Sequence, residues 1–376
     1  MKKISIYIHI PFCIRKCLYC DFLSAPAGAE EQEIYLRALL HEMVQESASY
    51  ANYTVDTVFI GGGTPSVVES KWIVKILCIL RECFAFTRHP EITIEMNPKT
   101  VTEQKLADYR EAGVNRLSIG LQSTDDGELS RLGRIHTYAD FLETYQMARK
   151  AGFQNINIDL MSALPGQSRE SYLLTLKRVL SLQPEHISAY SLIIEEGTPF
   201  YERRGDLSLP TEEEDRLMYA DTKVLLQEQG YERYEISNYA RKGYQCRHNL
   251  VYWIRGDYVG FGIGAASLVD NVRWSNVWQI QDYVNQNTKK EQSREILSTT
   301  SQMEEFMFLG LRLTEGISRL QFQKLFHRKI EEVYGEALNR HKREGLLFMG
   351  NRIRFTDKGM DVADYVLTDF MIEEAK

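Results

Sequence analysis

The sequence predicts an α/β protein, a partial (β/α)6 TIM-type barrel followed by a small winged-helix-like α+β domain at the C-terminal end. Two observations carry this prediction. Short β-branched runs alternate with amphipathic stretches over the first 200 residues, which is typical of a parallel sheet with helical crossovers. Polar or glycine-rich residues also follow nearly every expected strand, and a parallel barrel gathers such strand ends on one face. Six strands instead of eight would leave this barrel open at one side.

The expected elements follow one another in regular order. The six strand-like runs span residues 4–10, 57–62, 91–97, 116–122, 155–161 and 186–193. The helical patterns between them span residues 33–45, 72–84, 103–113, 141–152 and 171–183. The order alone does not distinguish an open sheet from a barrel, so the preference for a barrel rests on the residues at the strand ends.

The remainder of the chain divides where its composition changes. A break at residues 203–210 precedes Thr211 and Glu214, which form a capping box for a helix that runs to about Gly230. Residues 231–275 are rich in aromatic side chains and glycine, with irregular patterning. We therefore predict three segments: the barrel at 1–205, a connecting helix and aromatic region at 206–298, and the C-terminal domain at 299–376.

The C-terminal segment predicts a winged-helix-like arrangement. Ser318 caps one expected helix, a second spans about 330–345, residues 346–355 read as a hairpin with a Gly-Asn turn, and a last helix begins near Asp357. Such a domain suggests DNA binding, but residues 318–376 hold 11 Lys/Arg against 10 Asp/Glu. A surface that follows phosphates needs more positive charge, so we expect a packing or lid role and no nucleic-acid partner.

Composition narrows the class of protein further. The net charge of -7 argues against bulk nucleic-acid binding, and the six cysteines do not suggest a secreted disulfide scaffold. No run of 18 apolar residues predicts a membrane span, and the first residues lack the long apolar region of a signal peptide. We expect a cytoplasmic protein.

Three of the six cysteines lie within eight residues, directly after the first expected strand, as Cys13-x3-Cys17-x2-Cys20. A structural zinc site needs four ligands, and no nearby Cys or His completes that set, because His9 lies in the strand before the triplet and is expected to serve the core. Three thiolates suit a [4Fe–4S] cluster whose fourth iron stays open and can chelate S-adenosylmethionine (SAM). The alternative is three unrelated buried cysteines, a set that rarely has this spacing.

The segment CIRKCLYC resembles the CxxxCxxC signature of the radical SAM superfamily, and the IGGGTP motif fits a backbone that approaches the methionine end of SAM. The motifs YIHIPFC, IEMNP, RLSIGLQS, DLMSALPGQ, AYSLIIEEGTP and FGIGAASL resemble one subgroup of that superfamily. This subgroup contains oxygen-independent coproporphyrinogen III oxidase and its paralogue, the haem chaperone HemW. The resemblance extends from Tyr7 into the C-terminal segment.

The resemblance implies a set of SAM contacts at matching positions, namely Tyr7, Tyr19, Phe22, Gly62, Gly63, Thr64, Glu95, Gln122, Arg134, Asp159, Met161 and Ala189. Glu95 would accept hydrogen bonds from a ribose hydroxyl or the SAM amino group. Gln122, Arg134 and Asp159 would order the polar atoms. The alternatives are that Glu95 and Asp159 satisfy backbone donors and that Arg134 is a surface charge.

Two departures separate the branches of this subgroup. The oxidase pattern continues with a further cysteine two positions after the third, where this chain has Phe22. The longer N-terminal segment of the oxidase also has no counterpart before Lys2. Both differences weaken the expectation of an oxidase.

A second motif favours the chaperone branch. The segment His248-Asn249-x-x-Tyr252-Trp253 resembles the HNxxYW motif of the haem chaperones. A neutral imidazole is a common haem ligand, and aromatic rings can flank a porphyrin. The alternative is that His248 is a satisfied interior residue and that Tyr252 and Trp253 belong to the core.

The sequence therefore predicts a haem chaperone on a radical SAM scaffold. It would bind haem and a [4Fe–4S] cluster with SAM, and transfer haem to acceptor haem proteins. The acceptors are not identified by the sequence; membrane-associated ones are an option, as is a homodimer of this chain. The alternative function is oxygen-independent coproporphyrinogen III oxidase, and whether the chain is an enzyme stays open.

Overall fold

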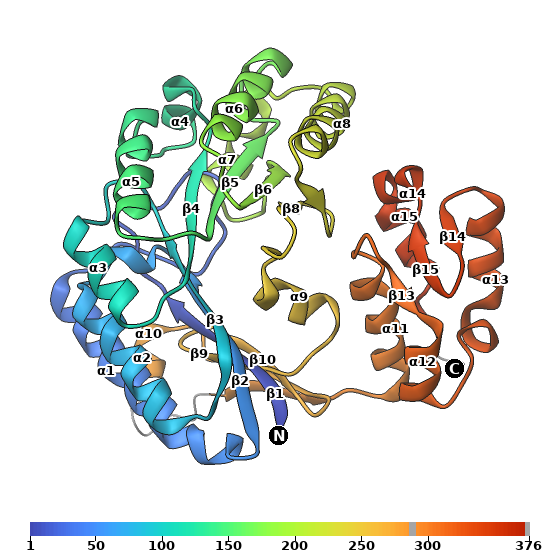
Figure 1. Cartoon of the computed structure of the whole chain (residues 1–376), viewed down its shortest axis with the longest axis horizontal. Coiled ribbons are helices and arrows are strands. Elements are labelled where there is room, and N and C mark those ends of the chain that lie inside the picture. Colours follow the sequence, from blue (N-terminus) through green and yellow to red (C-terminus); the bar gives the residue numbers. More distant parts are fainter. Residues whose placement is uncertain (286–290, 373–376) are drawn as a thin grey trace.

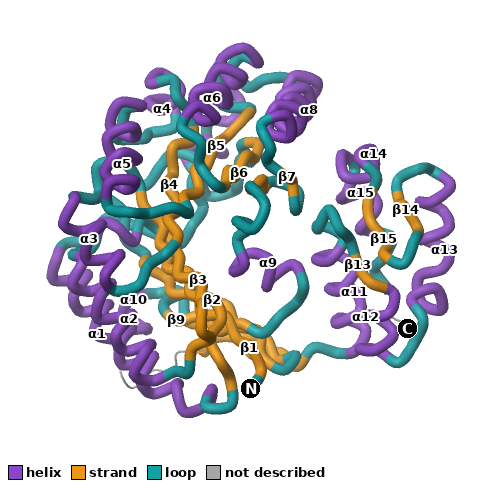
Figure 2. The backbone as a smooth tube through the Cα atoms, in the orientation of Figure 1, coloured by secondary structure: helices purple, strands orange, loops and turns teal. Residues whose placement is uncertain are grey.

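The centre of the molecule is one twelve-stranded sheet, seen in a computed structural model that describes residues 1–285 and 291–372 (Figures 1 and 2). Its middle consists of six consecutive parallel strands: β1 (Lys2–Ile10), β2 (Tyr53–Gly62), β3 (Phe86–Met96), β4 (Arg116–Gln122), β5 (Ile156–Ser162) and β6 (His186–Ser191). The sheet order ends at β12 and β7 without closing. The predicted open, six-stranded α/β core is thus confirmed.

Helices connect these strands and cover the convex face of the sheet (Figure 1). They are α1 (Ala29–Glu46), α2 (Ser70–Cys83), α3 (Glu103–Glu111), α4 (Asp126–Arg131), α5 (Tyr138–Lys150) and α6 (Arg169–Ser181). The local sequence explains where several of them begin, because the side chains of Thr102, Asp125, Thr137 and Ser168 each accept a backbone N–H of the first turn. Every residue of β4 is buried, as expected for a central parallel strand.

Both edges of the parallel core are extended by strands that the sequence patterning did not reveal. On the β1 side lie β9 (Tyr258–Phe261), β10 (Ala266–Val269), β11 (Val272–Asn276) and β12 (Glu291–Ile296). On the β6 side lie β8 (Asn238–Ala240) and β7 (Glu232–Arg233). Residues 231–275, expected to be irregular, thus hold short strands, because runs of two to five residues give no readable alternation.

Beyond β6, the chain forms α7 (Pro199–Glu202), α8 (Glu212–Glu228), α9 (Arg247–Trp253) and α10 (Ile280–Val284). Of these, α8 and α10 contribute side chains to the core of the sheet. The predicted capping box at the start of α8 is present, since Thr211 and Glu214 each accept the backbone N–H of the other residue. Met218, Leu226, Phe261 and Tyr283 belong to the same hydrophobic cluster as the strands of the barrel.

The C-terminal segment has a hydrophobic cluster of its own, centred on residues such as Phe322, Ile353 and Phe370. Its elements are α11 (Thr299–Gly310), β13 (Ile317–Ser318), α12 (Arg319–Phe326), α13 (Ile330–Arg343), β14 (Leu347–Met349), β15 (Arg352–Phe355), α14 (Asp357–Asp361) and α15 (Ala363–Thr368). The three strands pair in the order β13-β15-β14, so the predicted small α+β domain with its hairpin is confirmed. Among the described helices, none is long and apolar enough to cross a membrane.

Candidate cofactor site

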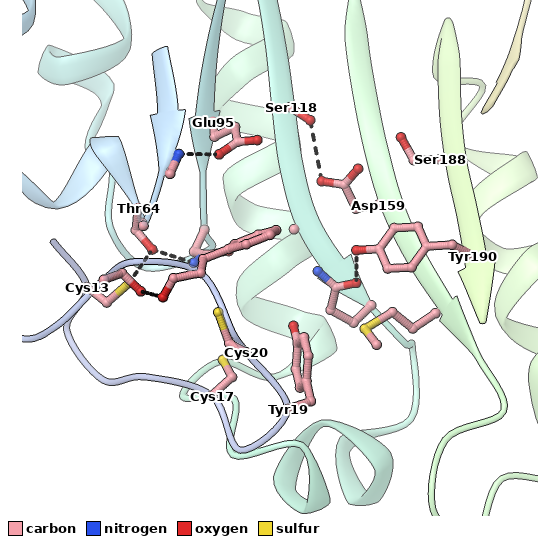
Figure 3. A pocket seen from close by; sticks show the side chains of 18 of the residues that line it. Cys13, Cys17, Tyr19, Cys20, Thr64, Glu95, Ser118, Asp159, Ser188 and Tyr190 are labelled. Carbon is pink, nitrogen blue, oxygen red and sulfur yellow. Dashed lines mark hydrogen bonds between the residues drawn. The ribbon is translucent and has the colours of Figure 1, made fainter. Parts of the chain in front are cut away.

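A cavity of about 530 Å³ lies within the concave side of the sheet (Figure 3). One end is formed by the loop after β1, which carries Cys13, Cys17 and Cys20. Ten of the twelve predicted SAM positions also line it: Tyr19, Phe22, Gly62, Gly63, Thr64, Glu95, Gln122, Arg134, Asp159 and Met161. Tyr7 and Ala189 are not among the lining residues.

The cysteine loop is tied to the barrel by backbone hydrogen bonds. Cys13 donates to the carbonyl of Ala25 at 3.1 Å, and Leu18 donates to that of Leu132 at 3.1 Å. The three thiols are free and half-buried. Among the described residues, no group of three or more His, Cys, Asp or Glu converges on a single ion. A cubane presents a separate iron to each thiolate, so three thiols spread along one loop fit a cluster better than a mononuclear metal.

Two polar side chains reach the cysteine sulfurs from the strands. The Thr64 hydroxyl donates to Sγ of Cys13 at 3.6 Å, and Nη1 of Arg134 donates to Sγ of Cys17 at 3.6 Å. Arg134 is half-buried and also donates to Oδ1 of Asn97 at 2.6 Å and to the carbonyl of Gly120. The alternative that Arg134 is a surface charge is therefore wrong. Its guanidinium and the thiolates it faces form a charge-complementary end of the cavity.

The glycines after β2 permit close approach of the backbone to this loop. Gly62 has φ +112°, and a Cβ on it would lie 2.6 Å from the ring of His9. A Cβ on Gly63 would lie 2.7 Å from the carbonyl oxygen of Phe12. Neither position can carry a side chain without displacing the strand or the cysteine loop.

Two carboxylates face each other across the cavity (Figure 3). Glu95 accepts the backbone N–H of Gly62 at 3.1 Å, and burial together with Asp159 raises the pKa of Glu95 to about 7. Asp159 accepts from Nδ2 of Asn157 at 2.7 Å and from the Ser118 hydroxyl at 3.4 Å, while burial raises its pKa. The alternative that Glu95 satisfies a backbone donor thus holds in part. A cationic ligand would favour the ionised form of both groups.

Sequence reasoning missed several polar residues of the wall. They include Arg116, Ser118, Asn157, Ser188, Tyr190 and Asn238. Most lie on the parallel strands at every second position, as Arg116, Ser118, Gly120 and Gln122 do along β4. Alternation along each strand was the signal that could have found them, because the inward face of a barrel strand recurs with a period of two.

His248 lies in the first turn of α9 and is 1% exposed. Its Nδ1 is 2.7 Å from the Thr57 hydroxyl, and its Nε2 is 2.9 Å from the Tyr252 hydroxyl. Thr57 gives its own proton to Ser5, so Nδ1 of His248 donates to Thr57 and Nε2 accepts from Tyr252. Burial, followed by the charge of Arg116, lowers the pKa of His248 to about 3. In this arrangement neither ring nitrogen is available to iron.

The other two aromatic residues of the motif pack in different directions, Tyr252 against β9 and Trp253 against the C-terminal domain. Tyr252 packs edge-on against Tyr258, with ring centroids 4.8 Å apart. The guanidinium of Arg312 lies over the ring of Trp253, at 4.9 Å from its centroid. Figure 1 shows α9 between the concave side of the sheet and the C-terminal domain. The motif thus lies at a joint of the molecule, and its role in haem binding stays a prediction.

Comparison with known proteins places these features in a family. Residues 7–179 match the model of the radical SAM superfamily, and residues 297–362 match that of the HemN C-terminal domain. Coproporphyrinogen III oxidase (HemN) from Escherichia coli has a similar fold, with a TM-score of 0.87 and 24% identity over 99% of this chain and 91% of that one. The fold and the cysteine-lined cavity define a radical SAM protein.

The full-length relatives define the family more narrowly. The chain is 34% identical to heme chaperone HemW of Lactococcus lactis, covering 99% of this chain and 98% of the relative. It is 35% identical to the HemW of Bacillus subtilis, over 98% and 99%, and 38% identical to that of Escherichia coli, over 86% of each. The chain belongs to the HemW family of the radical SAM superfamily.

Proposed function

We propose that this protein is a haem chaperone that binds haem and delivers it to acceptor haem proteins. The observation that carries the proposal is end-to-end similarity to relatives named heme chaperone HemW, at 34–35% identity over at least 98% of both chains. Its radical SAM scaffold would hold a [4Fe–4S] cluster through Cys13, Cys17 and Cys20. SAM would occupy the adjoining cavity, with its polar groups ordered by residues such as Glu95 and Arg134.

The chemistry of the cavity supports this cofactor assignment. When bound, a cluster with one open iron supplies a site that can chelate SAM and pass it an electron. The chain contributes three thiols, a guanidinium directed at one of them, and two half-buried carboxylates suited to a cationic ligand. The glycines at 62 and 63 let the backbone of β2 form part of the wall. Whether SAM is cleaved is a separate question from whether it is bound.

Phe22 argues for the chaperone rather than the oxidase. It occupies the position at which the oxidase pattern has a further cysteine, and its side chain is 61% exposed while lining the cavity. An exposed phenylalanine at the mouth of a polar cavity offers a flat apolar surface to a large planar ligand. It cannot supply the chemistry of a thiol.

We further propose that haem ligation by His248, with Tyr252 and Trp253 beside the porphyrin, requires a rearrangement of α9. The lone pair of Nε2 now accepts the Tyr252 proton, so Tyr252 must swing away before iron can bind there. Of the basic residues near the motif, Arg247 is paired with Asp56 at 2.6 Å and Arg255 with Glu305 at 2.8 Å. These two would have to exchange partners to meet a haem propionate.

The setting of the function is also a proposal. We place the protein in the cytoplasm, where thiols such as those of the cysteine loop stay reduced. Acceptors would be haem proteins, including membrane-associated ones, and a homodimer is compatible with transfer between protomers.

The test measures haem binding and coproporphyrinogen turnover in the same anaerobically reconstituted sample. We expect a haem-dependent spectrum and no protoporphyrinogen. His248→Ala should abolish the ligand-field features, whereas Tyr252→Phe should strengthen binding because it releases the Nε2 lone pair. Rapid protoporphyrinogen formation would instead establish the oxidase. A spectrum that is unchanged in both variants would remove His248 as the ligand while leaving haem binding intact.

A further inference from the structure

Arg116 is a buried cation that makes no direct hydrogen bond or ion pair with any described residue, and the carboxylates of Glu91 and Asp159 act on its charge only at longer range. Its side chain is 2% exposed, yet within residues 1–285 and 291–372 its guanidinium makes no hydrogen bond and no ion pair, and its Nε is fully enclosed. Burying an unpaired charge is costly, and native proteins nearly always supply an acceptor. Arg116 lines the cofactor cavity, so its missing acceptor can come from a bound molecule.

The carboxylates around Arg116 are already occupied. Glu91 accepts the backbone N–H groups of Arg247 and His248, each at 3.0 Å. Asp159 is held by Asn157 and Ser118. Neither acid comes within 4.0 Å of the guanidinium, so neither forms an ion pair with it. The five N–H donors of Arg116 thus exceed what the surrounding protein accepts.

A second unpartnered polar group lines the same cavity. The carboxamide of Asn249, on α9, makes no hydrogen bond to any described residue. Arg116 pairs with Thr93 on β3, two residues beyond Glu91, whose carboxylate accepts the first N–H groups of α9, so the start of α9 lies on the side of the sheet near Arg116. A fork of N–H donors with an adjacent amide is the arrangement that recognises a planar carboxylate.

This subsite is distinct from the end of the cavity that faces the cysteines. Arg116 is the first residue of β4, whereas Gln122 is the last. Six steps of a parallel strand span about 20 Å. Arg134, which donates to Cys17, already supplies a cation at the cysteine end. A carboxylate bound beside the cysteine loop would therefore lie too far from Arg116 to contact it.

We propose that Arg116 and Asn249 form a carboxylate-binding subsite at the inner end of the cavity. Two sources of that group are chemically equivalent here: a propionate of haem entering past α9, or a small free carboxylate. The haem source rests on the proposed function, and the free-carboxylate source does not.

The experiment compares binding of haem, haem dimethyl ester and sodium propionate to the full-length, anaerobically reconstituted protein. Arg116→Met removes the guanidinium at similar volume, and Asn249→Asp adds a negative charge near it. If haem supplies the carboxylate, wild type should bind haem at least tenfold more tightly than the ester. Either variant should abolish this preference and leave the affinity for the ester unchanged.

A free carboxylate gives a different supporting result. Sodium propionate would then raise the thermal midpoint of wild type but of neither variant, while haem and its ester bind alike. If Arg116→Met does not fold, the comparison of wild type with Asn249→Asp provides the test for both haem and propionate. The subsite is ruled out if neither arm depends on these residues, or if the Arg116→Met change weakens only SAM binding. If neither haem nor its ester binds, the proposed function is wrong. The measurement with sodium propionate then still tests the subsite.

Discussion

Glu95 shows how the cavity shifts the pKa of a single side chain. The carboxyl is half-buried in the cavity wall, faces Asp159, and receives one backbone hydrogen bond, from Gly62. Burial and the neighbouring acid favour its protonated form more than that one hydrogen bond favours the anion, so its pKa rises to about 7. Near neutral pH the Glu95 carboxyl is therefore half-protonated, and a bound cation would favour its fully ionised form.

The raised pKa predicts a pH-dependent stability. Because the folded state holds the Glu95 proton more tightly than the unfolded state, the free energy of unfolding should fall as pH rises from about 4.5 through 7. A shift from 4.5 to about 7 corresponds to at most about 3 kcal/mol. Urea denaturation of the cofactor-free protein at pH 5 and pH 8 measures this difference. Glu95→Gln should shrink it, whereas Glu143→Gln, at an exposed position on α5, should not.

Helix α9 illustrates how an element too weak to form alone is held by the fold. Seven residues cannot sustain a helix in water, and the Cys246 side chain gives its first turn no cap. The cap comes instead from β3, where the Glu91 carboxylate accepts the backbone N–H groups of Arg247 and His248. His248 adds a stacked contact with Phe59, with ring centroids 5.2 Å apart.

Glu91→Gln tests this anchoring. The amide replaces one accepting oxygen with a donor, leaving a buried N–H of α9 without a partner. We expect the free energy of unfolding to fall by about 1–3 kcal/mol. Glu213→Gln is the control, since Glu213 is an exposed carboxylate in the first turn of α8 and caps no other described helix, and it should cost under about 0.5 kcal/mol. Equal effects of the two changes would contradict the anchoring role.

The difference between local signals and long-range contacts explains which features of the fold and site could be predicted from the sequence. The six core strands and the residues at their ends were predictable, because β-branched runs and short chemical motifs are local signals. Arg134 was placed in the site by motif alone, and its burial beside Cys17 could not be read from sequence. The cap of α9 by Glu91 joins residues more than 150 positions apart, and no local pattern reports such a contact. The position of His248 agrees with the alternative of a satisfied interior residue, but its hydrogen bond to Thr57, 191 positions away, could not be predicted from any local pattern.

At the scale of the whole molecule, the barrel and the C-terminal domain are joined through Glu305. This α11 carboxylate pairs with Arg255 at 2.8 Å and with Arg273 at 2.7 Å, and its side chain is 16% exposed. Trp253 and Arg312 pack alongside. The joint therefore connects the strand extension β9–β12 and the HNxxYW helix to the domain that covers the open side of the barrel (Figure 1).

Glu305→Gln should loosen this joint. Removing the charge leaves two partly buried guanidinium groups without their carboxylate, at an expected cost of about 1–2 kcal/mol. Because the C-terminal domain has its own hydrophobic cluster, thermal unfolding should separate into two transitions. Differential scanning calorimetry measures this separation. The exposed pair of Arg216 and Glu212 supplies a control, and Glu212→Gln should leave a single transition.

The central claim is that three cysteines hold a cluster whose open iron faces the SAM cavity. Electron paramagnetic resonance of the reduced, reconstituted protein, recorded with and without SAM, tests it most directly. We predict a [4Fe–4S] signal that changes on addition of SAM and is absent from the Cys13→Ala/Cys17→Ala/Cys20→Ala variant. A signal that survives in that variant, or one that SAM leaves unchanged in wild type, would contradict the claim.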